Sequence, residues 1–173
     1  MSTEPAARAV APNLTATSTS EQYLTFALDQ ELFAIPILAV QEIRGLETVS
    51  RIPRSPSDVL GVMNLRGVVV PVVDLRRRLG IAPAGHTSTT VVILVRLAAA
   101  GAAAKAVGCV VDAVSDVAHI ADSAVRPAPE ACGRIESHFL KGVVEVDGRL
   151  VLLLDLGLLL GAGEAAGAAR GAA

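Results

Sequence analysis

Short runs of β-branched and other apolar residues, separated by turn signals, fill most of the chain. The clearest run covers residues 90–97, and a second, 106–111, follows an Ala/Gly segment at 98–104 that we expect to be a surface loop. Runs of this length, bounded by Gly, Pro or Asp, are typical of buried strands joined in hairpins. Further strands are expected at 22–28, 31–35, 49–52 and 120–125, and on both sides of Arg66. Helical signals are confined to short pieces, so the pattern predicts a mainly β fold of small closed barrels.

The helical signals occur at a few places. Apolar residues spaced by three at Ile37, Val40 and Ile43 suit a short helix or an extended corner with one buried face. Ser55 stands before a proline and three residues ahead of an aspartate, which is the pattern of a helix start with Ser55 as the N-cap. We therefore expect short helical segments between the strands.

The chain contains an internal repeat. Residues 61–80 and 142–161 align without a gap and are identical at eight of twenty positions, including their bounding glycines. A second pair of related segments, 33–43 and 107–117, precedes them in the same order. Recurrence of two blocks in one order predicts two related, hairpin-rich units in tandem.

Changes in composition suggest the domain boundaries. Residues 1–20, rich in Ala, Thr, Ser and Pro, are expected to be a disordered tail, and residues 162–173 form an Ala/Gly-rich tail. The domain between them, 21–161, divides at a Pro/Gly/Ser/Thr-rich connector into lobe one, about 22–86, and lobe two, about 87–161. This division leaves open that strands are exchanged between the lobes.

Charge is unevenly distributed although the whole chain carries only −2. Between Arg44 and Arg78 lie seven arginines and three acids, whereas from Leu79 onward the balance is −2. One interpretation is docking to partners of complementary charge, and the other is solvated turns that keep an apolar fold in solution. The aromatic fraction of 2% disfavours nucleic acid, because single strands are bound largely by stacking. No signal peptide or membrane span is evident, so a cytosolic location is expected.

Candidate chemistry is sparse. Asp74 and Asp155 occupy equivalent repeat positions and could act as a pair of catalytic carboxylates facing one cleft. The simpler interpretation is that each caps the helical turn that follows it. The three histidines, His86, His119 and His138, share no metal-ligand spacing, and there is no phosphate-binding glycine loop. We therefore expect no metal, no cofactor and no enzymatic activity.

Arg66 is the most informative cation. It stands beside Gly67 at a hairpin tip between two apolar strands, where a long charged side chain is a poor core residue. Its guanidinium could bind a carboxylate in two places, across a groove between the lobes or on a partner protein. The sequence leaves both open.

The motifs around this hairpin resemble those of the CheW-type chemotaxis coupling proteins. The resemblance covers about 22–161 and is carried by Ala-Val-Gln-Glu-Ile at 39–43, Ile-Pro-Arg-Ser-Pro at 52–56, Val-Leu-Gly-Val-Met-Asn-Leu-Arg-Gly at 59–67 and Val-Val-Pro-Val-Val-Asp-Leu at 69–75. It implies two SH3-like five-stranded β-barrel lobes with a shared hydrophobic core. It also implies a non-enzymatic adaptor without a cofactor, which bridges chemoreceptors and a CheA-type histidine kinase.

The resemblance assigns partner-binding residues. Asn64, Arg66 and Gly67 match the family's signature loop near the receptor-facing groove, and the segment with Val40, Glu42 and Ile43 matches a region of partner contact. The resemblance leaves open which of these residues face the kinase and which face the receptor. One lobe is expected to dock on the related regulatory domain of the kinase, while the groove between the lobes takes the cytoplasmic tip of a methyl-accepting receptor. Other CheW-like proteins are further candidate partners.

The resemblance also implies a cytoplasmic protein recruited to membrane receptor arrays. A coupling role in a non-flagellar chemosensory pathway is an alternative that the sequence does not distinguish. The enzyme that would use Asp74 and Asp155 is the less favoured alternative.

Overall fold

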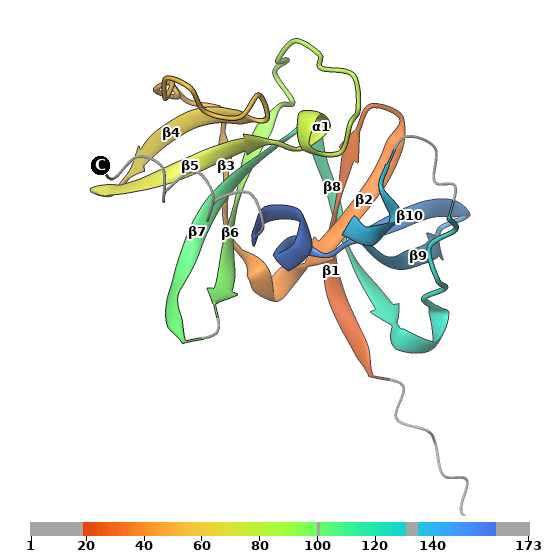
Figure 1. Ribbon diagram of the computed structural model, residues 1–173. Helices are drawn as coiled ribbons and strands as arrows, with labels where there is room; N and C mark the ends of the chain where they lie inside the picture. The colour runs from red at the N-terminus through yellow and green to blue at the C-terminus, as the bar shows by residue number, and fades with distance from the viewer. Residues whose placement is uncertain (1–18, 100, 131–134, 162–173) are drawn as a thin grey trace, which may run out of the picture.

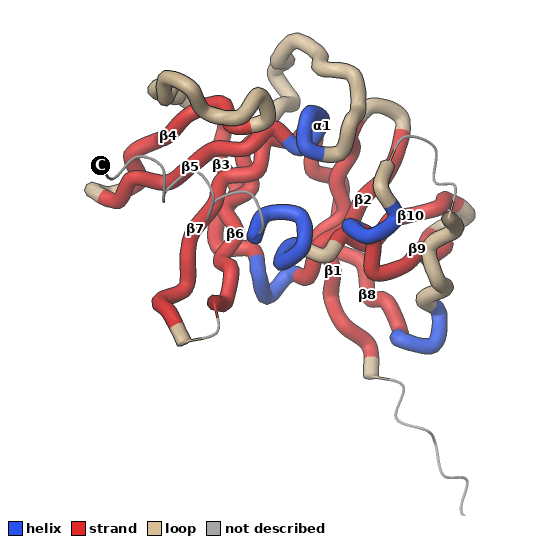
Figure 2. The backbone as a smooth tube through the Cα atoms, in the orientation of Figure 1, coloured by secondary structure: helices blue, strands red, loops and turns tan. Residues whose placement is uncertain are grey.

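Ten strands form two separate five-stranded sheets in the computed structural model, which describes residues 19–99, 101–130 and 135–161 (Figures 1 and 2). We call the sheet with strand order β3-β6-β7-β5-β4 lobe I, and the sheet with order β8-β1-β2-β10-β9 lobe II. The remaining elements are a four-residue helix, three 3-10 turns and a last helical turn at 156–161. The mainly β fold class expected from the sequence is confirmed.

The strands of lobe I are β3 Val40–Gly45, β4 Val59–Leu65, β5 Val68–Asp74, β6 Val91–Ala99 and β7 Ala102–Val111. Those of lobe II are β1 Ser20–Leu28, β2 Glu31–Pro36, β8 Ala113–Ala121, β9 Leu140–Val146 and β10 Arg149–Leu154. The helical elements are η1 Ile37–Ala39, α1 Leu75–Arg78, η2 Asp122–Ala124 and η3 Ser137–Phe139.

The division expected at residues 86–87 does not separate the two sheets. The first two strands belong to lobe II, although they precede that boundary, and β6 and β7 belong to lobe I, although they follow it. The chain therefore passes between the sheets twice, through η1 and again at Asp112, the single residue between β7 and β8. This is the strand exchange that the sequence left open.

The pairing registers follow the internal repeat. In lobe II, β2 and β10 run parallel with Ala34 opposite Leu153, and in lobe I, β7 and β5 run parallel with Gly108 opposite Val72. Ala34 and Gly108 are equivalent in one repeat, and Leu153 and Val72 are equivalent in the other. The two lobes are thus related copies, each closed by strands from both halves of the chain.

Apolar side chains form three buried clusters. One lies within each lobe, and the largest lies between them and contains the stacked rings of Phe26 and Phe33, 6.0 Å apart. Leu75 of α1 and the C-cap residue Leu79 enter this shared core, and so do their repeat equivalents Leu156 and Leu160 in the last helical turn. The expected shared hydrophobic core is present because both copies of the repeat place leucines on it.

Several local expectations need correction. No helix begins at Ser55, because β4 already starts at Val59 and leaves no room for a helical turn. The Ser55 hydroxyl instead donates to the Ile52 carbonyl at 3.0 Å. The segment 37–43, expected as a short helix or an extended corner, is the 3-10 turn η1 followed by the start of β3, in agreement with that expectation. The Ala/Gly segment 98–104 is not a loop throughout, since β6 extends to Ala99 and β7 starts at Ala102.

Two further expectations concern segment ends. The strand expected at 120–125 is the end of β8 followed by η2. The expected tail to residue 20 ends earlier, because β1 begins at Ser20. Residues 1–18 and 162–173 lie outside the described residues.

Each sheet closes on itself through one short bridge. Ser50, which follows edge strand β3, exchanges two backbone hydrogen bonds of 2.9 Å with Val62 of the opposite edge strand β4. Arg126 and Val143 make the equivalent pair in lobe II, with both bonds at 2.8 Å. The residue before each bridge on β4 and β9 is a glycine, because the passing backbone leaves no room for a Cβ atom there.

Gly61→Ala is expected to lower the free energy of unfolding by about 1–3 kcal/mol, the usual range for forcing atoms into a packed site. A Cβ atom there would overlap the Ser50 carbonyl, and the φ of +147° is itself unfavourable for alanine. The measurement is urea denaturation followed by circular dichroism. Gly85→Ala is the matched control, because a Cβ atom at Gly85 meets nothing within 4 Å. Equal stability of the two variants would contradict this account of the closure.

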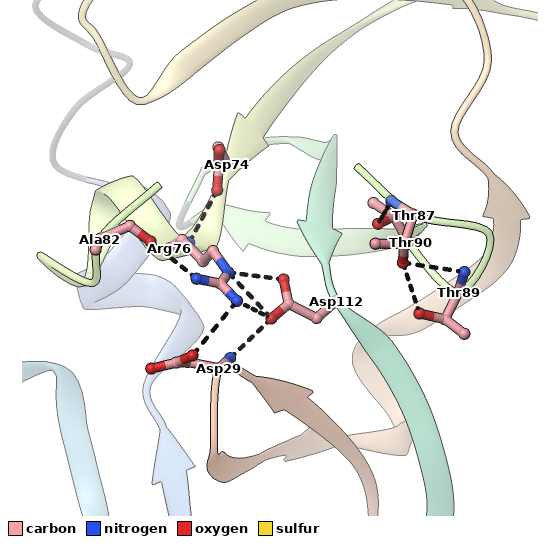
Figure 3. Close-up of polar contacts among 8 residues, drawn as sticks. All are labelled: Asp29, Asp74, Arg76, Ala82, Thr87, Thr89, Thr90 and Asp112. Carbon is pink, nitrogen blue, oxygen red and sulfur yellow. Dashed lines mark hydrogen bonds and ion pairs between the residues drawn. The ribbon is translucent and has the colours of Figure 1, made fainter. Parts of the chain in front are cut away.

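Polar contacts also join the lobes (Figure 3). Arg76 of α1 donates from Nε to both carboxylate oxygens of Asp112, at 2.8 and 3.0 Å, and from Nη1 to the Ala82 carbonyl at 2.8 Å. Asp112 also accepts from the Asp29 N–H at 2.7 Å, and Arg76 lies 3.8 Å from the Asp29 carboxylate. We call Arg76, Asp112 and Asp29 the clamp; it fixes the helix of lobe I to the β1–β2 turn of lobe II at a chain crossover.

The clamp makes stability dependent on acid pH. Partial burial would raise the pKa of Asp112, but hydrogen bonds from Arg76 and the Asp29 N–H, with the charges of Arg76 and His86, lower it below its ordinary value. A carboxyl whose pKa is lower in the folded than in the unfolded state contributes stability that is complete above the unfolded pKa. That contribution is lost as the pH falls through the folded pKa.

We expect the melting temperature to fall as the pH drops below about 4, near the ordinary aspartate pKa, and to fall less steeply in Asp112→Asn. Thermal melts between pH 3 and pH 7 measure this difference. Asp116→Asn is the control, because Asp116 lies on β8, four residues after Asp112, and takes no part in the clamp. Parallel melting curves for wild type and Asp112→Asn would refute the role of Asp112.

Candidate functional site

The β4–β5 hairpin presents Arg66 at its tip. Arg66 and Gly67 form the two-residue turn, with φ of 51° and 85°, as required at both central positions of a type I′ turn. Asn64 stabilises it, because its side-chain oxygen accepts a hydrogen bond of 2.8 Å from the Gly67 N–H. The Arg66 side chain is 78% exposed. The signature loop therefore holds a cation outward on a well-defined turn.

Arg66 is paired within its own lobe. Its Nη2 lies 3.4 Å from Oε2 of Glu42 on β3, and Glu42 is also 3.7 Å from Arg44. The carboxylate that Arg66 contacts in the structure therefore belongs to the same lobe and does not lie across the groove between the lobes. Glu42 and Arg66, which lie 24 positions apart, were both predicted to bind partners, but the sequence did not indicate that they contact each other.

The other predicted residues divide into two groups. Ile43 is exposed beside Glu42, whereas Val40 is half-buried and packs against the shared core. Val68 and Val69, next to the turn, are also exposed and were not predicted. Side chains alternate along a strand, so Ile43 points to the opposite face of β3 from Glu42, and Val69 to the opposite face of β5 from Val68. Exposed apolar side chains near an exposed cation are features of docking surfaces. We call Glu42, Ile43, Arg66, Val68 and Val69 the lobe I surface.

Lobe II carries an equivalent hairpin whose tip residue has the opposite charge. Its β9–β10 turn has Asp147, with φ of 50°, where lobe I has Arg66. Val117 is the repeat equivalent of Ile43 and Leu150 that of Val69, and both are exposed. Lobe I, residues 40–111, contains nine basic and four acidic residues. Lobe II, residues 20–36 and 113–161, contains four basic and ten acidic residues. The lobes thus carry formal charges of +5 and −6, a contrast hidden in the net charge of −2.

A groove of about 440 Å³ runs between the lobes. Its apolar lining includes Leu97 and Leu156, and three cations stand around it: Arg96, Lys105 and Lys141. The lining comes from the η1 corner, the β6–β7 hairpin, Lys141 and the last helical turn: Pro36, Ala39, Arg96, Leu97, Ala98, Lys105, Lys141, Asp155, Leu156, Gly157 and Gly161. Sequence reasoning expected a groove but could not list these residues, because the η1 corner and the β6–β7 hairpin meet only after strand exchange.

The two repeat aspartates cap the turns that follow them. Asp74 accepts from the Arg76 N–H at 3.0 Å, and Asp155 accepts from the Leu158 N–H at 3.1 Å. Asp155 lines the groove and Asp74 does not, so the two carboxylates do not face it together. Among the residues that the structure describes, no three His, Cys, Asp or Glu side chains are grouped to hold a metal ion.

Comparisons with known proteins agree with the fold and the motifs. The model of the CheW-like domain matches residues 22–164. The chain belongs to the CheW-like domain family. A chemotaxis protein CheW of Klebsiella aerogenes is 37% identical over 158 residues, covering 91% of this chain and 92% of that protein. A probable chemotaxis protein CheW of Rhizobium etli is 37% identical over 135 residues, covering 78% and 84%.

A solved structure extends this family relation to three dimensions. The scaffolding protein TtCheW from Thermoanaerobacter tengcongensis matches with a TM-score of 0.73 and 28% identity, covering 84% of this chain and 90% of that one. The family resemblance expected from the sequence is therefore confirmed. The partner roles of the six predicted residues in this CheW-like chain stay predictions. In the described ranges, no helix is long and apolar enough to cross a membrane.

Asn64→Ala is expected to lower the free energy of unfolding by about 1 kcal/mol, the usual value of one hydrogen bond, because the Gly67 N–H loses its acceptor. Asn64→Asp keeps an acceptor oxygen at that place and should stay close to wild type. Chemical denaturation of the three proteins measures the difference. If the alanine and aspartate variants are equally destabilised, the hydrogen bond to Gly67 does not hold the turn.

Proposed function

We propose that this chain is a non-enzymatic scaffold that couples transmembrane chemoreceptors to a CheA-type histidine kinase in bacterial chemotaxis. The observation that carries the proposal is the match to the CheW-like family along nearly the whole described chain, together with the outward-held Arg66 of the signature loop. Coupling by a scaffold requires two separate contact surfaces, and the lobe I surface and the groove supply them.

The lobe I surface would bind the kinase. The regulatory domain of a CheA-type kinase is itself a related double barrel. We expect the basic lobe I of this chain to bind an acidic lobe of the kinase domain, equivalent to lobe II. Arg66 would exchange its weak contact with Glu42 for a carboxylate on the kinase, while Val68 and Val69 lose water. Opposite charges on the two lobes favour a head-to-tail arrangement and speed association. The same complementarity makes other CheW-like proteins candidate partners.

The groove would bind the receptor. The cytoplasmic tip of a methyl-accepting receptor is a helical hairpin, which can place apolar side chains on Leu97 and Leu156. Arg96, Lys105 and Lys141 would attract acidic residues on the flanks of that hairpin. Both lobes line the groove, so a receptor bound there touches the two halves of the scaffold at once.

The place of action follows from these partners. We infer a cytoplasmic protein recruited to membrane receptor arrays by the receptor tips. A non-flagellar chemosensory pathway would use the same two surfaces. The catalytic alternative has less support, because Asp74 is engaged as a cap away from the groove.

The test is a double variant, Glu42→Ala with Arg66→Ala, titrated by calorimetry with the regulatory domain of a CheA-type kinase. We expect affinity to fall about tenfold or more, as for a charged residue at the centre of an interface. The circular dichroism spectrum should not change, because Arg66 is largely exposed.

Arg54→Ala is the matched control for the kinase titration. Arg54 is also an exposed arginine with positive φ, at 63°. Its loss lowers the charge of lobe I by one, whereas the double variant leaves that charge unchanged, so an effect of net charge alone would appear in the control. In both variants, binding of a receptor cytoplasmic fragment should match wild type, because neither position lines the groove. A folded double variant that binds the kinase domain normally would remove the site assignment.

A further inference from the structure

The chain crosses between the lobes at two equivalent positions of the internal repeat, which carry charged residues at one crossover and uncharged residues at the other. In the repeat of 33–43 and 107–117, Leu38 of η1 corresponds to Asp112, and in the repeat of 61–80 and 142–161, Gly157 corresponds to Arg76. Arg76 and Asp112 form the clamp. At the other crossover, Leu38 is 97% exposed and Gly157, which has no side chain, lines the groove. One junction is filled by ionic contacts, and its counterpart is open.

The clamp is built to fix an orientation. Arg76 is only 13% exposed, and its guanidinium donates to Asp112 and to the Ala82 carbonyl at once, so its planar fork has little freedom (Figure 3). Asp112 is the crossover residue itself, and its N–H donates to the Ala27 carbonyl of β1 at 3.2 Å. The clamp therefore ties the crossover to both lobes.

A second arginine acts beside the clamp. Arg78 of α1 pairs with Asp58 in lobe I, and its Nε donates to the Leu159 carbonyl at 2.7 Å. Leu159 belongs to the last helical turn, which also lines the groove through Leu156, Gly157 and Gly161. The position of the groove wall is thus connected to α1 by a direct hydrogen bond.

Packing of the shared apolar core limits how far one lobe can rotate against the other, and the clamp narrows that range further. Burial of apolar surface is non-directional, whereas ion pairs with hydrogen bonds have preferred geometry. Since both lobes contribute lining residues, a rotation of one lobe against the other changes the width of the groove.

We propose that Arg76, through Asp112 and Asp29, is a positioning residue that locks the lobes at one junction and thereby sets the width of the groove at the other. The inference rests on the proposed function, because it assigns the clamp to the receptor-binding site. Affinity for a groove partner then depends on a residue that does not touch it. Affinity for a partner on the lobe I surface does not depend on the clamp, because one lobe forms that surface.

The experiment compares Arg76→Ala with Arg77→Ala. Arg77 is the adjacent arginine of the same helix, and its contacts, Asp74 at 3.5 Å and the Ser57 carbonyl at 3.0 Å, stay inside lobe I. Each variant is titrated with a receptor cytoplasmic hairpin fragment and with a kinase regulatory domain. Arg76→Ala should lower receptor affinity at least about fivefold, the lower end of ordinary coupling between distant sites, and leave kinase affinity within about twofold. Arg77→Ala should change neither.

Residual dipolar couplings of the backbone amides, measured without any partner, test the clamp independently of the proposed function. One alignment tensor should fit both lobes in wild type and in Arg77→Ala, whereas Arg76→Ala should need a different tensor for each lobe. Arg76→Lys is the second variant if the alanine form does not fold, because a lysine keeps the charge but cannot donate as a planar fork. It should reproduce the loss in part.

The outcomes separate the two proposals. A single tensor for both lobes in folded Arg76→Ala overturns the role of the clamp, whatever the partners do. Equal losses of receptor and kinase affinity also overturn it, because they indicate general damage rather than a change in the groove. If wild type binds neither probe while the tensors behave as expected, the proposed function fails and the clamp stands as a device that orients the lobes.

Discussion

Neither sheet of this protein can be completed by one half of the chain. Each lobe joins two hairpins through a parallel strand pair, β5 with β7 in lobe I and β2 with β10 in lobe II. In lobe II these strands come from opposite ends of the described chain. Parallel pairing requires a long connection, and between β2 and β10 that connection includes all of lobe I, residues 40–111. The two lobes are therefore bound to each other by the path of the backbone before any side chain contributes.

This path explains where the core lies. The strands that cross over carry Phe26, Phe33 and Ile93 into the shared cluster, and the leucines of both repeat helices close it from the ends. A core between two copies of a repeat is filled by equivalent residues from each, which accounts for the identical leucines at 75 and 156 and at 79 and 160. The lobes act as one body because the largest apolar cluster belongs to neither alone.

The sequence predicted the repeat, the strands and the hairpin tip, because these depend on local pattern. It did not predict which strands share a sheet, because a buried valine such as Val107 on β7 fits the apolar pattern of a strand in either lobe. The helix start at Ser55 failed for a related reason, since strand pairing of β4 overrode a local capping pattern. Arginines in a helical turn can complement the negative C-terminal end of that turn. Instead, Arg76 finds its partner 36 residues away at a crossover, which no local pattern contains.

Exchange of strands also changes how charge should be assessed in this family member. Divided after residue 86, the chain has a first half without net charge and a second half of −2, but divided by sheet it has two lobes of nearly equal and opposite charge. Part of that charge is used internally, because Arg76 and Arg78 are paired and little exposed. Arg66 differs from them in having an exposed, single, longer contact, so a partner can take it at small cost. The same residue type thus orients the lobes where it is buried and is available for recognition where it is exposed, and burial rather than sequence position decides between the two.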